Sequence, residues 1–352
     1  MKNISLKIND SKTLKPICIY NMSWKQVLDF YQYNCNNNSD FLMKFNNIPF
    51  KLIENYSNPY GNIIKNMDLI LSNNQIDELT LMYLNNNLIA FRPGNVESSF
   101  AISYVFDIKI PNSHLNIDNN SELDKKIRSN AGLYYKDSTR RIEVLNWWSE
   151  HFIDLVRKST FCSCYCFLEY DLVLLSLLNI KSKFYDYSYL YQVILQNSEG
   201  KKILYIGNAV ESIKAGYKRG LQNVWKFHVS NFSMYYLKTP QTTTGMEFPH
   251  DSIIETSNDI IRKIDDNYCD FDTAIFGCGA YGAPLINILR KKYPQKNLIY
   301  LGSDCFKMFG VKINLQPWEL YDSNVNKDAV IDIVESLPDG CINHPEKKYW
   351  RL

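Results

Sequence analysis

The sequence has no apolar run of the ~20 residues that a membrane-spanning helix needs, and it has almost no excess of one charge. Its 352 residues include 39 Lys and Arg against 37 Asp and Glu, a formal net charge of +2. So small a charge gives no electrostatic reason to expect a nucleic-acid partner. The N-terminus, MKNISLKINDSKTLK, lacks the apolar core of a signal peptide. We therefore expect a cytoplasmic protein without a membrane span, in the host cytoplasm if the gene is viral.

Metal-binding and disulfide patterns are also missing, although the chain has nine cysteines. No C-x-x-C pair occurs, and the five histidines are scattered. Cys162, Cys164 and Cys166 alternate, so they would share one face of a strand, where small buried side chains are common. An odd number of cysteines without a secretory signal favours free thiols in a reducing compartment.

What the sequence does contain is a repeated strand-and-helix pattern. Hydrophobic residues make up 45% and charged residues 22%, as in folded globular proteins. Apolar runs of strand length begin near residues 88, 161, 201, 272 and 297, and helical patterns lie between them. Alternation of this kind predicts an α/β fold, with a Rossmann-like, mainly parallel sheet flanked by helices. The domain would cover residues 71–315, with 1–70 as an N-terminal extension of unknown role and 316–352 as a C-terminal tail that packs on it.

The clearest unit is the stretch Phe271–Gly310. Phe271–Phe276 is an apolar run of strand length, and apolar residues at i, i+3 and i+4 spacing then predict a helix with one buried face. Pro284 lies where the first helical turn should begin, and there its missing N–H costs nothing. Asn297–Leu301 is the next predicted strand. A strand–turn–helix–strand unit usually forms a parallel crossover.

A glycine-rich turn, GCGAYG, joins the first of these strands to the helix. Gly277, Gly279 and Gly282 fit G-x-G-x-x-G, in which the backbone approaches a ligand and the helix start directs N–H groups at phosphate. We therefore predict a nucleotide or nucleotide-sugar site here, which includes the intervening Ala280 and Tyr281. The alternative is that the glycines only permit a tight turn and close packing of helix on sheet.

The same order of strand, glycine and helix start occurs earlier, in KKILYIGNAVES. Gly207 ends the strand, and Glu211 and Ser212 open the following helix, so these residues join the predicted donor site. Farther along, the loop Lys238–Gly245 is rich in hydroxyl groups and could contact a ligand.

A polar segment follows the predicted strand Leu88–Phe91. It contains Arg92, Gly94, Asn95 and Glu97. Ligands of open α/β sheets collect at the carboxyl ends of strands, so this segment could serve a diphosphate, a sugar hydroxyl or a metal ion. An ordinary polar loop with a helix cap is the alternative.

Several of these segments, in this order, resemble GT-D-type glycosyltransferase-like proteins of polysaccharide biosynthesis clusters. They are RPGNVE, NAGLYY, GKKILYIGNAVESI, the KTPQ loop, FDTAIFGCGAYGAPL, and IYLGS with FKMFGVK, and together they span most of residues 76–315. The resemblance implies a Rossmann-like GT-D fold. It also implies transfer of a sugar from a nucleoside-diphosphate-sugar donor to a glycan or other hydroxyl acceptor.

The resemblance further implies residue roles, with two departures. The group's D-x-E element, associated with metal and donor binding, falls on Asn95-Val96-Glu97. Glu97 is predicted to be the catalytic carboxylate, as a base or a metal ligand. Asn95 is a poorer metal ligand than an acid, which leaves a requirement for Mn²⁺ or Mg²⁺ in doubt. After Lys312 the group usually continues with basic residues and Trp, but this chain has Ile313-Asn314-Leu315, so acceptor choice or activity could differ.

The predicted donor site therefore draws on several segments. Arg92 and the amides of the glycine turn would bind the diphosphate. Gly302 ends the second strand of the unit, and Asp304 just after it would bind a sugar or ribose hydroxyl or cap a helix. Lys312 completes the predicted donor-binding set.

Two other functions remain open. Gly277, Gly279 and Gly282, with Asp304 about 20 residues on, also fit an NAD- or S-adenosylmethionine-dependent enzyme. Against it, too few residues follow the turn for the remaining strands of a standard dinucleotide domain. The amide at Asn95 keeps open a non-catalytic protein that binds sugar nucleotides. The sequence indicates neither the donor sugar nor an oligomeric state.

Overall fold

The computed structural model describes residues 73–94, 96–98, 100–101, 122–163, 183–185, 187–245, 248–313 and 323–336. The predicted N-terminal extension, Asn95, Cys164, Cys166 and most of the predicted C-terminal tail lie outside the described residues.

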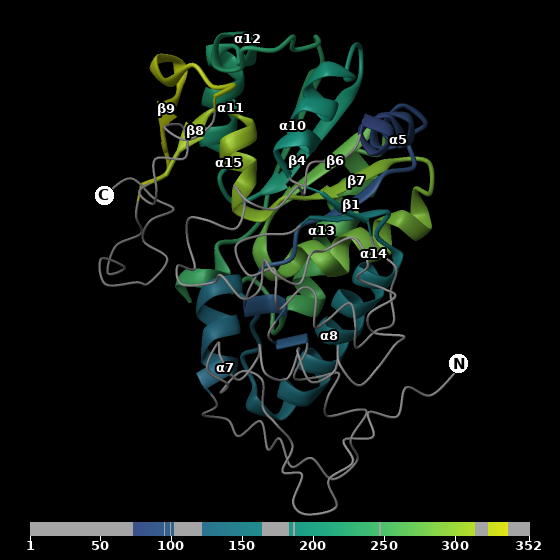
Figure 1. The fold of residues 1–352 in the computed structure, drawn as a ribbon. Helices are drawn as coiled ribbons and strands as arrows, with labels where there is room; N and C mark the ends of the chain where they lie inside the picture. The colour runs from purple at the N-terminus through teal and green to yellow at the C-terminus, as the bar shows by residue number, and fades with distance from the viewer. Residues whose placement is uncertain are drawn as a thin grey trace, which may run out of the picture.

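The centre of the fold is a parallel sheet. Its strands are β1 (Ile89–Phe91), β2 (Phe161–Ser163), β3 (Lys183–Tyr185), β4 (Lys202–Gly207), β5 (Ser233–Lys238), β6 (Thr273–Gly277) and β7 (Asn297–Tyr300). They form one seven-stranded sheet in the order β3-β2-β1-β7-β6-β4-β5, and every neighbouring pair is parallel. Figure 1 shows helices on both faces of this sheet. The predicted α/β fold with a Rossmann-like parallel sheet is confirmed.

The helices divide between two hydrophobic cores, one on each face of the sheet. One core contains α8 (Arg141–Lys158), α13 (Ile253–Asn267) and α14 (Gly282–Lys292). The other contains α5 (Asn73–Leu84), α10 (Tyr187–Gln196), α11 (Val210–Arg219), α12 (Leu221–Val224) and α15 (Cys305–Met308). Short helical turns lie at the sheet edge or between longer elements: α7 (Glu122–Lys126), η2 (Ile127–Ala131), η3 (Ser138–Arg140), η4 (Thr242–Thr244), η5 (Gly279–Tyr281), η6 (Gly302–Asp304) and η8 (Lys327–Ala329).

Alternate residues of a central strand enter different cores. On β4, Leu204 and Ile206 belong to one core, and Ile203 and Tyr205 belong to the other. All four side chains are buried. A parallel strand covered on both faces is therefore apolar at every position, which is why β4 could be recognised as a continuous apolar run.

The sequence pattern predicted five strands and missed β3 and β5. Both are edge strands of the sheet. On β5, only Leu237 is buried, while Ser233 and Lys238 are exposed. An edge strand has fewer neighbours, so its sequence, SMYYLK, lacks the continuous apolar run of a central strand.

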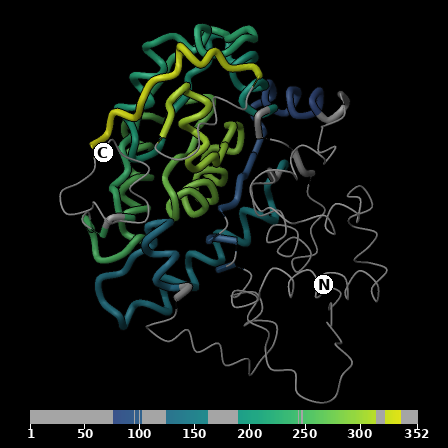
Figure 2. The backbone as a smooth tube through the Cα atoms, turned by 60° about the vertical axis from the view of Figure 1, so that its left-hand side comes forward, coloured from purple at the N-terminus to yellow at the C-terminus, as the bar shows by residue number. Residues whose placement is uncertain are grey.

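A second, two-stranded sheet lies beside α11. In it, β8 (Val311–Lys312) pairs with β9 (Ile331–Asp332) in parallel. Trp225 and Val325 form a further bridge, so the described residues 323–336 contact the α12 region. Figure 2 shows this segment in yellow along one side of the molecule. Among the helices of the described ranges, none has the length and apolar character needed to cross a membrane.

Candidate functional site

The carboxyl ends of the parallel strands lie along one edge of the sheet, where ligands of such folds bind. The connections change face at this edge. The helix α11, which follows β4, packs in one core, and α14, which follows the neighbouring β6, packs in the other. The neighbouring strands β1 and β7 also send their chains to opposite faces, because α8, which follows β1, and α15, which follows β7, lie in different cores. Such switch points leave a crevice, so the candidate site is at the ends of these four strands.

Gly207 and Gly277 are direct partners at the ends of β4 and β6. A Cβ added at Gly277 would lie 3.0 Å from both the Cys305 Sγ and the Tyr205 hydroxyl oxygen. A Cβ at Gly207 would overlap the same hydroxyl. Packing around Tyr205 therefore requires glycine at 207 and favours it at 277, whether or not a ligand approaches them.

The rest of the glycine turn is also packed against protein. Tyr300 donates a hydrogen bond from its hydroxyl to the Gly279 carbonyl (3.0 Å), and its ring occupies the space that a Cβ at Gly282 would need. Trp148 donates from Nε1 to the Ala280 carbonyl (2.8 Å). The N-cap side chains of η5 and α14 make no capping bond. The Gly282 N–H at the start of α14 already donates to the Gly279 carbonyl, and Pro284 has no N–H, so an anion would have to bind at the start of η5. With Ala280 and Tyr281 each 1% exposed, the alternative of close packing explains this turn as well as ligand approach does.

A turn of π-helix, η2, covers the glycine turn. Its last residue, Ala131, presents its carbonyl to Gly279, where a Cβ would overlap it. Thr242 donates from Oγ1 to the carbonyl of Gly132 (2.6 Å), which ends the π-helix in the left-handed conformation. Thus the predicted hydroxyl-rich loop uses at least one hydroxyl to hold η2 in place. Turns of π-helix are rare and often occur at functional sites.

Arg92 and Asp304 form a buried ion pair between the ends of β1 and β7. The Arg92 Nε lies 2.8 Å from the Asp304 Oδ2, and the two side chains are 6% and 3% exposed. Arg92 also donates from Nη2 to the Ser303 Oγ (3.0 Å). Gly302 has φ of +56°, and a Cβ there would lie 3.2 Å from the Arg92 Nη2. The contacts of Asp304 therefore make it an anchor for Arg92, with little of the carboxylate open to a ribose.

Glu97 lies on the helical residues 96–98 that follow Arg92, and it is half-buried. Its carboxylate packs over Gly94, where a Cβ would overlap Oε2. Burial raises the pKa of the Tyr300 phenol well above its usual value, and the nearby charge of Glu97 raises it further. The structure thus brings Arg92, Glu97 and Tyr300 together at this edge, while Asn95 lies outside the described residues.

The described carboxylates do not gather into a metal site. Within the ranges that the structure describes, no three His, Cys, Asp or Glu side chains lie close enough together to hold a metal ion. Mn²⁺ and Mg²⁺ sites use several oxygen ligands, of which Glu97 could supply one group. A requirement for a divalent metal stays a prediction.

The start of α11, the other predicted phosphate position, is capped by a carboxylate from far along the chain. The backbone N–H of Ser212 donates to Glu335 Oε1 (3.0 Å), and the Ser212 hydroxyl donates to the other carboxylate oxygen. Val334 in turn donates its N–H to the Ser212 Oγ (2.8 Å). Glu211 is exposed and pairs with Lys214 (2.8 Å). Sequence reasoning missed Glu335, because a cap that comes from 123 residues away leaves no local pattern.

Lys312, the remaining predicted donor-binding residue, lies on β8. Its Nζ is 3.1 Å from Asp332 Oδ1 on the paired strand β9, and both side chains are largely exposed. This places Lys312 in the two-stranded sheet beside α11, a separate sheet from the one that carries the glycine turns.

Comparisons with known proteins add one structural likeness. No family model matches the chain, and no curated protein sequence matches it. A solved structure described as the selenomethionine-substituted structure of domain of unknown function 1792 is similar with a TM-score of 0.35 and 13% identity, over 74% of this chain and 94% of that chain. A likeness of this size carries no functional argument, so function rests on the residues at the sheet edge.

Proposed function

We propose that the protein is a glycosyltransferase that moves a sugar from a nucleoside-diphosphate sugar to a hydroxyl acceptor. One observation carries the proposal: a buried cation, Arg92, and a half-buried carboxylate, Glu97, lie together at the carboxyl edge of a parallel sheet. Sugar transfer needs a positive charge near the leaving diphosphate and a carboxylate near the acceptor. Both residues belong to RPGNVE, a segment that resembles GT-D-type proteins.

In the proposed step, the acceptor oxygen bonds to the anomeric carbon while the bond from that carbon to the diphosphate breaks. The bonding electron pair leaves with the nucleoside diphosphate, and Glu97 takes the proton of the acceptor hydroxyl. Arg92 provides a guanidinium near the growing negative charge, and its pair with Asp304 fixes its position while it offsets part of its charge. Asp304 and Ser303 hold the guanidinium in place, so they act as positioning residues.

The test is turnover of a panel of UDP-, GDP- and dTDP-sugars, each with and without Mn²⁺, measured as release of nucleoside diphosphate. Glu97→Gln should lower turnover by roughly 10²–10⁴-fold, the usual contribution of a general base. Its affinity for the donor should change little, because the amide keeps the shape of the carboxylate. Glu150→Gln, which changes an exposed carboxylate on α8, is the matched control and should behave as the wild type.

Three results would count against the proposal. Full turnover by Glu97→Gln would remove the proposed base. Nucleotide-sugar binding without any release of diphosphate would indicate the non-catalytic binding protein. A rise in melting temperature with NAD(H) or S-adenosylmethionine alone would indicate the dinucleotide-type enzyme, although Asp304, its expected ribose ligand, is paired with Arg92 and only 3% exposed.

A further inference from the structure

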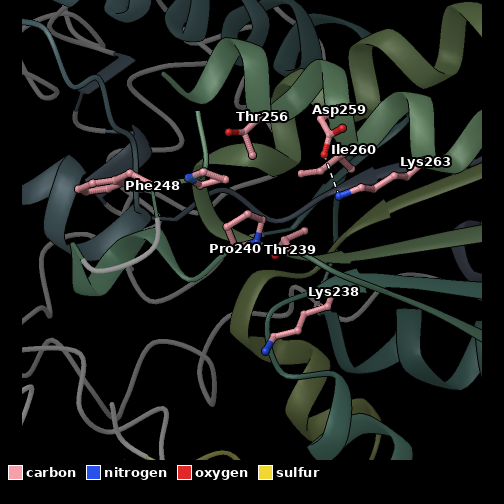
Figure 3. A pocket seen from close by; sticks show the side chains of 9 residues that line it. Lys238, Thr239, Pro240, Phe248, Thr256, Asp259, Ile260 and Lys263 are labelled. Carbon is pink, nitrogen blue, oxygen red and sulfur yellow. Dashed lines mark ion pairs between the residues drawn. The ribbon is translucent and has the colours of Figure 1, made fainter. Parts of the chain in front are cut away.

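A cavity of about 450 Å³ lies between the carboxyl end of β5 and the first turns of α13. Its size is within the range of small-molecule binding sites. Figure 3 shows residues from α13 on one side of it and residues from the end of β5 on the other, with Phe248 at a third side. The lining consists of Lys238, Thr239, Pro240, Phe248, Pro249, Thr256, Asp259, Ile260 and Lys263.

The cavity shares a wall with the first glycine turn. The backbone N–H of Thr239 donates to the Gly207 carbonyl (3.0 Å), and Asn208 donates a hydrogen bond from its side chain to that of Gln241. Thr239 is 1% exposed, and its hydroxyl has no hydrogen-bond partner in the part of the chain that the structure describes. The segment Lys238–Pro240 would therefore separate a ligand in the cavity from a ligand at the ends of β4 and β6.

The walls combine an ionised carboxylate with a fixed aromatic ring. The Asp259 carboxylate is 15% exposed and lies 2.8 Å from the Lys263 Nζ and 2.5 Å from the Arg262 Nη2. The hydrogen bond from Lys263 lowers the pKa of Asp259, so it is charged at neutral pH. Phe248 stacks on Tyr134 with ring centroids 4.7 Å apart, which holds its ring in place.

We propose that this cavity binds the acceptor, a saccharide, through a sugar unit remote from the reacting hydroxyl, because β5 is four strand spacings, roughly 19 Å, from β1, after which Glu97 lies. The proposal rests on the transferase function proposed above. The Asp259 carboxylate accepts hydrogen bonds from sugar hydroxyls, and Lys238 and Lys263 on the same lining can donate to them, so the cavity offers a saccharide both acceptors and donors. Phe248, Pro240 and Ile260 offer apolar surface to the C–H groups of a sugar ring.

The experiment measures binding alone, so that it is independent of turnover. Saturation-transfer NMR would be recorded with methyl glycosides of glucose, galactose, mannose, rhamnose and N-acetylglucosamine, and with their disaccharides. Pro249→Trp fills the cavity from an exposed lining position, and Asp259→Asn removes the charge without changing shape. Asn258→Trp adds the same bulk at an exposed position of α13 outside the cavity, and it serves as the control.

The wild type and Asn258→Trp should bind at least one glycoside of the panel. Pro249→Trp should abolish that binding, and Asp259→Asn should weaken it on the order of tenfold, the effect of losing a hydrogen bond to a charged group. Affinity for UDP should be the same in all four proteins. Equal melting temperatures would show that the variants are folded, and the isosteric Asp259→Asn keeps the test valid if a Trp variant is not.

Failure of the cavity proposal and failure of the transferase proposal give different results. Absence of glycoside binding to the wild type, or binding that survives both Pro249→Trp and Asp259→Asn, would overturn the saccharide site. Loss of UDP binding in Pro249→Trp would also overturn it, because the cavity would then belong to the donor. Glycoside binding that Pro249→Trp abolishes, in a protein that turns over no sugar nucleotide, would keep the saccharide site and refute the transferase.

Discussion

Replacing Asp304 with Asn should destabilise the protein, because it removes the carboxylate that pairs with the buried Arg92 guanidinium. The two side chains are 6% and 3% exposed and their atoms are 2.8 Å apart, so water does little to compensate. Removing one partner of a buried ion pair costs about 3–5 kcal/mol. We expect the lower end, about 3 kcal/mol, because Ser303 still accepts a hydrogen bond from Arg92 and Asn keeps the shape of Asp.

The assay is urea unfolding followed by tryptophan fluorescence. At ~2–4 °C per kcal/mol, a loss of about 3 kcal/mol should also lower the melting temperature by about 6–12 °C. Asp266→Asn, at an exposed position, is the control and should change the free energy of unfolding by less than about 0.5 kcal/mol.

A double variant distinguishes two causes of lost stability, the buried charge of Arg92 and the loss of side-chain packing. Arg92→Met with Asp304→Leu removes both charges, so it should be more stable than Asp304→Asn alone, because neither member of the pair is left as a buried charge. If Asp304→Asn were as stable as the Asp266→Asn control, the buried pair could not be what holds Arg92 in place.

Two further predictions concern the cap of α11 and the half-buried His151. Glu335→Ala should lower the free energy of unfolding by about 1 kcal/mol, the usual contribution of a helix cap. Inorganic phosphate should then raise the melting temperature of this variant more than that of the wild type, since the Ser212 N–H is open to an anion; an equal rise in both would contradict the idea. Burial, with a smaller contribution from Lys291, lowers the pKa of His151 to about 4. Because the unfolded state binds more protons between pH 6.5 and 4, stability should fall as pH drops through this window. His151→Asn should reduce the difference in melting temperature between pH 7 and pH 4.5, and an unchanged difference would show that other groups cause it.

The central part of the fold was predictable because its signals are local. The β4, β6 and β7 strands are buried on both faces, so each is a short, almost continuous apolar run. The period of 3.6 residues marks α14, and a glycine turn separates it from β6. The edge strand β5 was missed because partial exposure removes the apolar run on which such a prediction depends.

The candidate site was predictable only in part. Parallel strands end at one edge, so the sequence could indicate that Arg92, Glu97 and the glycines would lie near one another. It could not indicate that the glycines are required by Tyr205, Tyr300 and the π-helical turn, because those neighbours come from other segments.

By itself, then, the sequence determined the strands and helices whose hydrophobic periods are strong, and with them the α/β class. Only the tertiary structure decided the strand order, the pairing of Arg92 with Asp304 across 212 residues, and the capping of Ser212 by Glu335. The physical reason is that a period of two or 3.6 residues is a property of neighbouring positions. A buried ion pair, or a helix cap supplied by a distant residue, forms only when the fold has brought the two segments to the same edge of the sheet.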